Sequence, residues 1–231
     1  MHTAFETGGS ASSGVRAALD ILGKKDITVM AWAGDGGTAD IGIQSLSGAA
    51  ERNDDFIYTC YDNEAYMNTG IQRSSSTPWG AWSTTTPRGK AEPKKNMMAI
   101  MAAHRIPYAA SASVAYPDDL IRKYTKAKTI HGTKYIQIFA PCPPGWKSLP
   151  EQSIKLARLA VKNGIFPLYE IENGEKYTIN YPSVKEKLVP INEYFKLQGR
   201  FRHLTEQDLR SIQKTVQRNW ALLLEKARIK P

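Results

Sequence analysis

The length and composition of the chain are those of an ordinary globular protein. It has 231 residues, of which 42% are hydrophobic and 23% charged, enough for one domain with a substantial core and an extension. The mean hydropathy is −0.42 and no apolar run approaches the roughly 18 residues of a membrane span, which excludes a transmembrane segment. The 31 Lys and Arg against 22 Asp and Glu give a net charge of +9, which permits a nucleic acid, an acidic protein or a phosphorylated cofactor as partner.

The cysteines and the amino terminus bear on location. Cys60 and Cys142 lie far apart without CxxC spacing, so the sequence predicts neither a disulfide framework nor a self-contained zinc site. Residues 1–6 lack the basic region and apolar core of a signal peptide. These features favour a reducing, cytoplasmic compartment, and we expect no membrane partner.

The first part of the chain alternates helical and strand patterns. Residues 14–22 have helical period, and the apolar run over 27–33, typical of a buried parallel strand, ends in GDGG at 34–37. Helical spacing resumes over 40–50, and a second apolar strand over 56–60 ends in a polar turn. This order predicts a right-handed crossover that brings both turns to the same edge of a parallel sheet.

The rest of the chain continues the alternation and predicts an α/β fold, with a mostly parallel sheet flanked by helices and a carboxy-terminal extension. Residues 66–95 are rich in Ser, Thr, Gly, Pro and Trp and predict a long ordered loop. Further predicted elements are helices over 94–104, 117–130, 153–162 and 205–227, strands over 108–114 and 134–139, and a hairpin around 167–181. We expect an α/β domain over 1–146 and an extension over 147–231, whose residues 184–231 hold 11 Lys and Arg against 5 Asp and Glu.

One constellation of residues points to a cation site. Asp35 follows the first apolar strand, Asn63 stands 28 positions later after the second strand, and Asn68 lies just beyond. Mg²⁺ prefers octahedral oxygen ligation, which carboxylate, amide or backbone carbonyl oxygens share with phosphate oxygens. Glycines at 34, 36 and 37 allow the backbone to approach an anion closely. The pattern favours a Mg²⁺-dependent diphosphate site over a simple tight turn.

Two common phosphate-binding motifs do not fit. The chain contains no GxxxxGK[ST] sequence, so the glycine-rich turn is not a P-loop. It is not the dinucleotide GxGxxG pattern either, because Ala39 stands where the third glycine would be, and Asp35 would repel a pyrophosphate unless a cation intervened.

Six segments distributed along the chain form a specific combination. They are GDGG at 34–37, CYDNEAYMNTGIQ at 60–72, SSSTP at 74–78, PCPPGW at 141–146, FPLYE at 166–170 and LQGRFR at 197–202. In this combination the chain resembles, over nearly all its length, the beta subunit of pyruvate:ferredoxin oxidoreductase. That protein is the thiamine diphosphate-binding subunit of the 2-oxoacid:ferredoxin oxidoreductase family. The resemblance implies a thiamine diphosphate-binding fold for residues 1–146.

The resemblance also implies roles for individual residues. The Mg²⁺ ligands of the family correspond to the Asp35 carboxylate, the Asn63 side-chain oxygen and the Ala65 backbone carbonyl. Asn68 lies in the segment that faces the reactive ring of the cofactor, which makes it the candidate catalytic residue. The residues expected to bind the cofactor are Gly34, Asp35, Gly36, Gly37, Asn63, Ala65, Asn68 and Thr69.

The activity implied by the resemblance is that of a pyruvate synthase, which converts pyruvate, coenzyme A and oxidised ferredoxin into acetyl-CoA, CO₂ and reduced ferredoxin. The thiazolium ylide of the cofactor attacks the 2-oxoacid carbonyl and serves as electron sink when CO₂ leaves. The alternative substrate is 2-ketoisovalerate or another 2-oxoacid. The implied partners are the alpha, gamma and delta subunits and ferredoxin, and the alpha subunit supplies the glutamate that activates the aminopyrimidine.

The resemblance implies that Cys142 corresponds to a ligand of an iron-sulfur cluster in the family. Beta subunits carry an amino-terminal segment with a CxxC pair and a further cysteine, which hold a [4Fe-4S] cluster together with the cysteine that matches Cys142. This chain begins downstream of that segment, and one thiolate cannot retain a cluster that needs about four. We expect a truncation, a misplaced start or ligands supplied by another chain.

Two other function classes stay open at this point. A nucleic-acid-binding module would account for the net charge of +9, but the basic residues of 211–230 alternate with apolar ones as in a packed helix, so we expect no nucleic-acid partner. A catalytically silent assembly subunit is the second alternative. Trp79 and Trp82 either cover the cofactor or pack on a neighbouring subunit.

Overall fold

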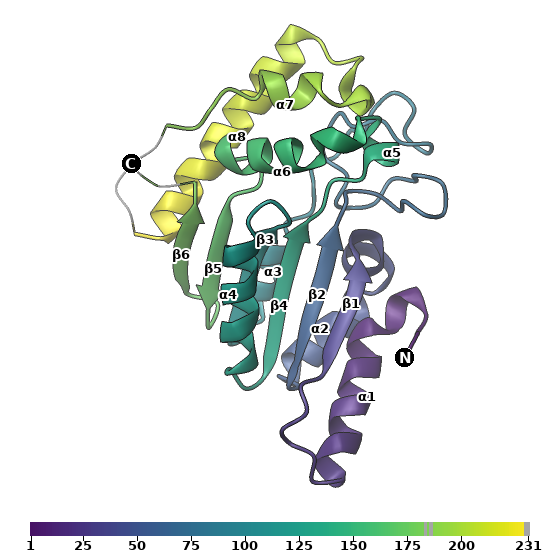
Figure 1. The fold of residues 1–231 in the computed structure, drawn as a ribbon, viewed down its shortest axis with the longest axis vertical. Helices are drawn as coiled ribbons and strands as arrows, with labels where there is room; N and C mark the ends of the chain where they lie inside the picture. The colour runs from purple at the N-terminus through teal and green to yellow at the C-terminus, as the bar shows by residue number, and fades with distance from the viewer. Residues whose placement is uncertain (183, 185–186, 229–231) are drawn as a thin grey trace.

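The computed structural model describes residues 1–182, 184 and 187–228 and is built on one sheet. Its strands are β1 (Met30–Gly34), β2 (Phe56–Asp62), β3 (Tyr108–Ser113), β4 (Thr133–Phe139), β5 (Leu168–Glu172) and β6 (Lys176–Tyr181). They are arranged in the order β1-β2-β4-β3-β5-β6. β1 to β4 are parallel, so their carboxyl ends meet at one edge of the sheet (Figure 1).

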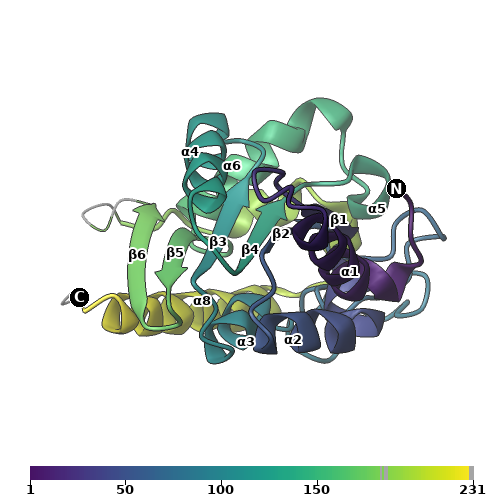
Figure 2. The same ribbon diagram turned by 90° about the horizontal axis from the view of Figure 1, so that it is seen from below.

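Helices cover both faces of this sheet. They are α1 (Gly8–Ile21), α2 (Ile43–Glu51), α3 (Met97–Ala103), α4 (Pro117–Lys128), α5 (Pro143–Trp146), α6 (Ser153–Lys162), α7 (Asn192–Lys196) and α8 (Glu206–Lys226). Shorter helical turns are η1 (Phe5–Thr7), η2 (Gly37–Ile41), η3 (Pro150–Gln152) and η4 (Gly199–Phe201). Figure 2 shows α4 and α6 on one face and α2, α3 and α8 on the other. Among the described residues, no helix is both long and apolar enough to cross a membrane.

The predicted crossover between the first two strands is confirmed. β1 and β2 pair in parallel, with Gly34 opposite Tyr61, and η2 and α2 connect them. The apolar side chains of β2 are buried on both faces, as expected of a central parallel strand. Phe56, Tyr58 and Cys60 join the core shared with α2 and α3. The turns that follow β1 and β2 therefore lie side by side.

The first helix and the first strand begin at positions that apolar periodicity did not predict. α1 begins at Gly8 rather than at residue 14, because its first turns pack through small residues. Gly9 is buried, and a side chain there would meet the backbone of Ser45 at 2.6 Å. β1 begins at Met30, three residues later than predicted, because the pairing with β2 starts there.

The carboxy-terminal part contains the predicted hairpin and long helix. β5 pairs antiparallel with β3, and β6 pairs with β5, so this part adds two strands to the same sheet. α8 begins after Thr205, whose side chain forms a capping box with Asp208. The division into 1–146 and 147–231 stays a prediction. Residues 183, 185, 186 and 229–231, which include the end of the basic segment, lie outside the described residues.

The long loop between β2 and α3 is ordered, as predicted. Its residues form only two isolated β-bridges, Tyr66 with Gln72 and Ser83 with Thr86. The loop is held from inside by Lys90, which is 1% exposed and donates to the carbonyl oxygens of three loop residues. These acceptors are Ser75 at 3.1 Å, Thr77 at 2.7 Å and Pro93 at 3.3 Å. α3 begins after Asn96, later than predicted, where the Asn96 side chain accepts from Ala99 N.

Candidate functional site

Asp35 lies at the carboxyl end of β1 and is completely buried. Its Oδ2 accepts a hydrogen bond from Ser74 Oγ at 2.5 Å, and its Oδ1 accepts one from the backbone N–H of Asn63 at 3.3 Å. Burial, and then the neighbouring Asp62 carboxylate, raise the pKa of Asp35 from 3.8 to about 8. The raised pKa means that the ionised form of Asp35 is destabilised by its surroundings, and a nearby cation would stabilise it.

An oxygen of Asp35 and two oxygens from the turn after β2 converge at the carboxyl end of β1. One terminal atom of the Asn63 side-chain amide lies 2.9 Å from both the Asp35 Oδ1 and the Ala65 carbonyl oxygen, and either the amide oxygen or the amide nitrogen can occupy this position. Adjacent ligands of an octahedral Mg²⁺ with bonds of about 2.0–2.1 Å lie about 2.9 Å apart. With the amide oxygen at this position, it and its two neighbouring acceptors repel one another unless a cation lies among them. Without a cation, turning the Asn63 amide lets its nitrogen donate to both other oxygens. The donor set fits Mg²⁺.

The turn that carries Asn63 and Ala65 has an unusual backbone. Glu64, between them, has φ of +68°, in the left-handed region that costs a residue with a Cβ roughly 1–2 kcal/mol. Its N–H donates to Asp62 Oδ1 at 3.2 Å, and its carbonyl accepts from Thr77 Oγ1 at 2.6 Å. The left-handed residue turns the flanking Asn63 side chain and Ala65 carbonyl toward the same point.

The glycines after β1 are packed tightly beneath the next turn. The Tyr66 hydroxyl donates to the Gly36 carbonyl at 2.9 Å, and a Cβ on Gly36 would collide with the Tyr66 ring. Gly37 begins η2, so the backbone leaves β1 directly into a helical turn at the carboxyl edge of the sheet. This local structure agrees with the expectation that glycines at 34, 36 and 37 bring the backbone close to an anion.

Asn68 and Thr69, predicted at the same site, lie on the surface. Both are exposed, in the turn between Tyr66 and Gln72. The Thr69 hydroxyl donates to the Gln72 side chain at 2.6 Å. In the part of the chain that the structure describes, no hydrogen bond joins Asn68 or Thr69 to the converging oxygens. The structure therefore brings together Asp35, Asn63 and Ala65, and leaves Asn68 and Thr69 at the rim.

Ionic side chains that the sequence did not single out surround the converging oxygens. Lys94 Nζ contacts Asp62 at 2.6 Å and Glu64 at 2.9 Å, and Arg200 contacts Glu64 at 2.6 Å. Although burial opposes the shift, Lys94 and Arg200 lower the pKa of Glu64 and keep its carboxylate charged. Burial raises the pKa of Asp62. Glu64 and Arg200 belong to two of the segments that carry the family resemblance. No local sequence pattern predicts that their side chains form a contact.

The remaining candidates have other surroundings. Cys60 is buried in β2, where burial raises the pKa of its thiol, and Cys142 is half-buried before α5. Trp82 packs under Lys147, whose Nζ lies 3.2 Å from the ring centroid, and Trp79 is 39% exposed. Within residues 1–182, 184 and 187–228, no group of three or more His, Cys, Asp or Glu could hold a metal ion. Asp35 carries the one ionisable group among the three converging oxygens.

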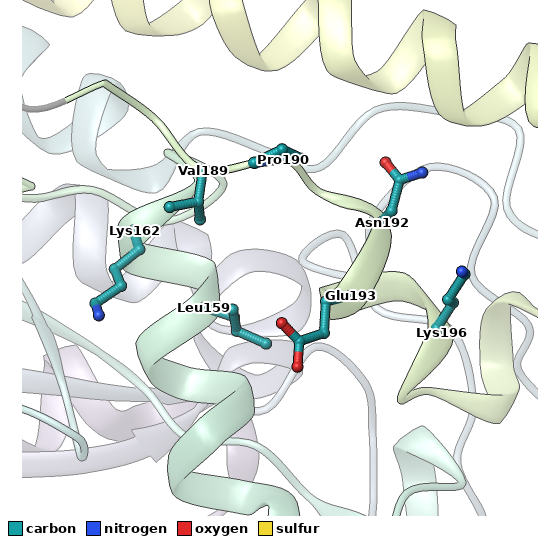
Figure 3. Close-up of a pocket in the computed structure, with 7 residues that line it drawn as sticks. All are labelled: Leu159, Lys162, Val189, Pro190, Asn192, Glu193 and Lys196. Atoms are coloured by element: carbon teal, nitrogen blue, oxygen red, sulfur yellow. The ribbon is translucent and has the colours of Figure 1, made fainter.

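A pocket of about 540 Å³ lies apart from these turns. Figure 3 shows it between α6 and the start of α7, lined by Leu159, Lys162, Val189, Pro190, Asn192, Glu193 and Lys196. None of these residues belongs to the turns after β1 and β2. The pocket is mainly apolar and has no carboxylate pair or buried donor set, so it is not a second cation site.

The amino-acid sequence is similar to proteins of known family. Residues 1–138 match the family described as "Thiamine pyrophosphate enzyme, C-terminal TPP binding domain". The chain is 55% identical to "Ketoisovalerate oxidoreductase subunit VorB" of Pyrococcus furiosus, over 99% of this chain and 76% of that protein. It is 53% identical to "Pyruvate synthase subunit PorB" of Methanocaldococcus jannaschii, over 96% of this chain and 78% of that protein.

The fold is also similar to a solved structure. It is a "2-oxoglutarate:ferredoxin oxidoreductase from Magnetococcus marinus with 2-oxoglutarate, coenzyme A and succinyl-CoA bound", with a TM-score of 0.57 and 26% identity. The match covers 68% of this chain and 60% of that chain. The predicted α/β fold and the family resemblance are thereby confirmed. The chain belongs to the thiamine pyrophosphate enzymes, in the branch formed by the subunits of 2-oxoacid:ferredoxin oxidoreductases.

Proposed function

We propose that this chain is the thiamine diphosphate-binding beta subunit of an enzyme that oxidises a 2-oxoacid, with coenzyme A and ferredoxin as co-substrates. The observation that carries the proposal is the convergence of the Asp35, Asn63 and Ala65 oxygens, with 2.9 Å from the Asn63 side chain to each of the others. Mg²⁺ held there would join the cofactor diphosphate to the ends of β1 and β2. The backbone at Gly34, Gly36 and Gly37 would approach the diphosphate.

The residues of this chain bind and orient. Bound thiamine diphosphate supplies the carbanion and the electron sink for decarboxylation. Asp35 and the two turns fix the diphosphate end of the cofactor, and Asn68 and Thr69, at the exposed rim, would contact it farther out, with Asn68 toward the reacting atoms. We assign no general base to this chain, since the resemblance implies that the alpha subunit provides the activating glutamate.

Other subunits are needed to complete the site, and the surface supports this. β1 is an edge strand, and it presents Met30 and Trp32 to solvent, the latter 59% exposed. Exposed apolar side chains on a strand edge are typical of a contact with another chain. We infer partners of the alpha, gamma and delta type and an acidic ferredoxin. Cys142 would ligate a [4Fe-4S] cluster only together with about three further ligands. The two free thiols are in keeping with a reducing, cytoplasmic location.

Pyruvate is the substrate we propose first, and 2-ketoisovalerate is the alternative. The sequence identity does not separate the two, since it is 53% to a relative named for pyruvate and 55% to one named for ketoisovalerate. The turns around Asp35 would hold the diphosphate, which is common to all these enzymes, and do not discriminate between 2-oxoacids. Steady-state kinetics of the assembled complex with both substrates measures the preference as a ratio of kcat/KM.

Calorimetric titration of thiamine diphosphate tests the site. We expect binding by the wild-type chain, alone or in its complex, only when Mg²⁺ is present, and loss of this binding in Asp35→Ala and Asn63→Ala. Asp20→Asn, on the exposed face of α1, serves as the control and should bind like the wild type. Mg²⁺-independent binding, or full binding by Asp35→Ala, would contradict the proposed site.

A further inference from the structure

Glu64, between two of the proposed Mg²⁺ ligands, is held from two sides. It is 2% exposed, and its Oε2 accepts from Arg200 at 2.6 Å while its Oε1 accepts from Lys94 at 2.9 Å. Because both carboxylate oxygens have charged partners, Glu64 is not free to act as a ligand itself. Its side chain instead anchors the left-handed backbone that separates Asn63 from Ala65.

Arg200 is itself fixed on every side. It lies in η4 and is 2% exposed. Its guanidinium stacks on the Trp146 ring at 3.8 Å, and its Nε donates to Gln198 Oε1 at 3.0 Å. Its carbonyl accepts from the backbone N–H of Trp82 at 2.9 Å. Arg200 therefore presents a preorganised donor to Glu64.

Trp146 provides a second connection to the same turn. Its indole Nε1 donates to the Asn63 carbonyl at 2.8 Å, while its ring lies against the Arg200 guanidinium. The turn is therefore contacted at two consecutive residues, at Asn63 by Trp146 and at Glu64 by Arg200. These two side chains come from the segments PCPPGW and LQGRFR, far from the turn in sequence and adjacent to it in space.

We propose that Arg200 is a positioning residue that holds the Asn63–Ala65 turn in the geometry needed for the cation. It acts through the Glu64 carboxylate and the Trp146 ring and does not touch the cation. This inference rests on the proposed function for its ligand. It assigns to the carboxy-terminal extension a direct part in forming a site whose proposed ligands all come from the first 65 residues.

Three variants separate positioning from general stability. Arg200→Met keeps an unbranched apolar stem but removes the guanidinium and its ion pair, and Arg200→Lys keeps the charge. Arg122→Met is the control for loss of an ion pair to a buried glutamate, because the half-exposed Arg122 pairs at 2.7 Å with Glu170, which is 2% exposed, on β5. β5 is separated from β1 by β2, β4 and β3. Removing either arginine leaves a buried glutamate with one charged partner fewer; because Arg200 is buried, Arg200→Met should lose more stability than Arg122→Met, and both are compared well below their unfolding transitions.

The first readout is ligand binding to the full chain, alone or in its complex. We expect Arg200→Met to weaken Mg²⁺-thiamine diphosphate binding about 10- to 100-fold, as loss of a residue that orients metal ligands does. Arg200→Lys should restore part of the affinity, and Arg122→Met should bind within about twofold of the wild type. With Mn²⁺ in place of Mg²⁺, the electron paramagnetic resonance spectrum of the bound ion should change in Arg200→Met only.

The second readout requires no ligand. In hydrogen–deuterium exchange, the amides of Asn63, Glu64 and Tyr66 should exchange faster in Arg200→Met and at the wild-type rate in Arg122→Met. Unchanged exchange in this turn, or wild-type affinity in Arg200→Met, overturns the inference. A wild-type protein that binds no thiamine diphosphate overturns the proposed function instead, and the exchange comparison then still decides whether Arg200 holds the turn.

Discussion

At the scale of single residues, the site depends on a carboxylate that is costly to bury. Asp35 is surrounded by protein, with Asp62 nearby, and its principal stabilising partner within the chain is the Ser74 hydroxyl. Lys94, which lowers the pKa of Asp35, is itself paired with Asp62 and Glu64, and Arg200 is paired with Glu64. The Asp35 carboxylate is thus left without a cationic partner of its own, and a divalent ion among the converging oxygens would stabilise its ionised form.

The raised pKa of Asp35 predicts that ligand binding releases a proton. With a pKa of about 8, Asp35 is mostly protonated at pH 7 in the unliganded protein, whereas the cation requires the carboxylate. The affinity for Mg²⁺-thiamine diphosphate should rise about tenfold per pH unit up to pH ~8 and then level off. Calorimetry in buffers of different ionisation enthalpy should count about one proton released at pH 7 and almost none at pH 9. A pH-independent affinity would contradict this prediction.

The raised pKa of Asp35 also predicts how the free energy of unfolding changes with pH. Because the folded-state pKa lies above the unfolded value of 3.8, protonated Asp35 favours the folded state, and this contribution is lost as the pH rises toward 8. Without ligand, the wild type should therefore lose stability relative to Asp35→Asn between about pH 4 and pH 8. Thermal unfolding of both proteins across this range measures the difference, and parallel curves would argue against it.

Gly36 is expected to be intolerant of any side chain. In Gly36→Ala the new methyl group collides with the Tyr66 ring, which is held by its hydrogen bond to the Gly36 carbonyl. Overpacking of this kind costs about 1–3 kcal/mol in the free energy of unfolding. Gly14→Ala is the control, since Gly14 lies within α1 with open space around it, and should stabilise by about 0.5–1 kcal/mol. Urea unfolding of both variants checks the two opposite signs.

At the scale of elements, the long loop between β2 and α3 behaves as a structural unit. It contributes Ser74 to Asp35, Thr77 to Glu64 and Lys94 to the ionic cluster, so three of its residues surround the converging oxygens. Since it lacks a helix or strand of its own, its shape depends on hydrogen bonds to its backbone. The buried ammonium of Lys90 provides three of these.

Replacing Lys90 should therefore loosen the whole loop. Lys90→Met leaves three buried carbonyl oxygens without their charged donor, and each such hydrogen bond contributes about 1.5 kcal/mol or more. We expect faster tryptic cleavage at Arg88 and weaker cofactor binding. Lys128→Met, on the exposed end of α4, should change neither. Limited proteolysis followed by mass spectrometry measures the cleavage, and an unaltered rate at Arg88 would show that other contacts hold the loop.

The elements could be predicted from the sequence where one local pattern dominates. The strand over 134–139 and the helix over 153–162 have uniform apolar patterns, and the structure confirms both to within one residue. α1 was predicted too short because close packing of Gly9 and Ser12 produces no apolar period. The pairing of Asp35 with Asn63 followed from the parallel crossover. The Arg200–Glu64 contact did not, because it depends on how the extension folds back across 136 residues.

At the scale of the whole molecule, the two outer strands of the sheet, β1 and β6, differ in the side chains they expose. β6, at one edge, exposes Lys176, Thr178 and Tyr181, whereas β1, at the other edge, exposes Met30 and Trp32 and leads into the turn that carries Asp35. Within the described residues, no other chain segment pairs with the free side of β1. The asymmetry places the surface best suited to another subunit next to the turns that we propose for the cofactor, where a partner can contribute groups to the reaction.

Trp32 should contribute more to assembly than to folding. It is 59% exposed, and among the described residues its ring stacks on Tyr61 alone, so Trp32→Ser should lower the stability of the isolated chain by less than about 1 kcal/mol. Its affinity for the other subunits should fall about tenfold or more, as for a central interface tryptophan. Ile121→Ser, at a similarly exposed position on α4, is the control. Sedimentation of reconstituted complexes measures assembly, and equal assembly of both variants would place the interface elsewhere.

The contact between Glu64 and Arg200 also has a consequence for biosynthesis. A chain emerging from the ribosome can complete β1, β2, β3 and β4 once residue 139 has left the exit tunnel, and the proposed ligands are then already present. Arg200 follows some 60 residues later, which at about 5–20 residues per second is a delay of several seconds. During this interval the nascent protein has its sheet but not the support of its cation turn. Loading of the cofactor is therefore expected only after Arg200 has emerged and reached Glu64.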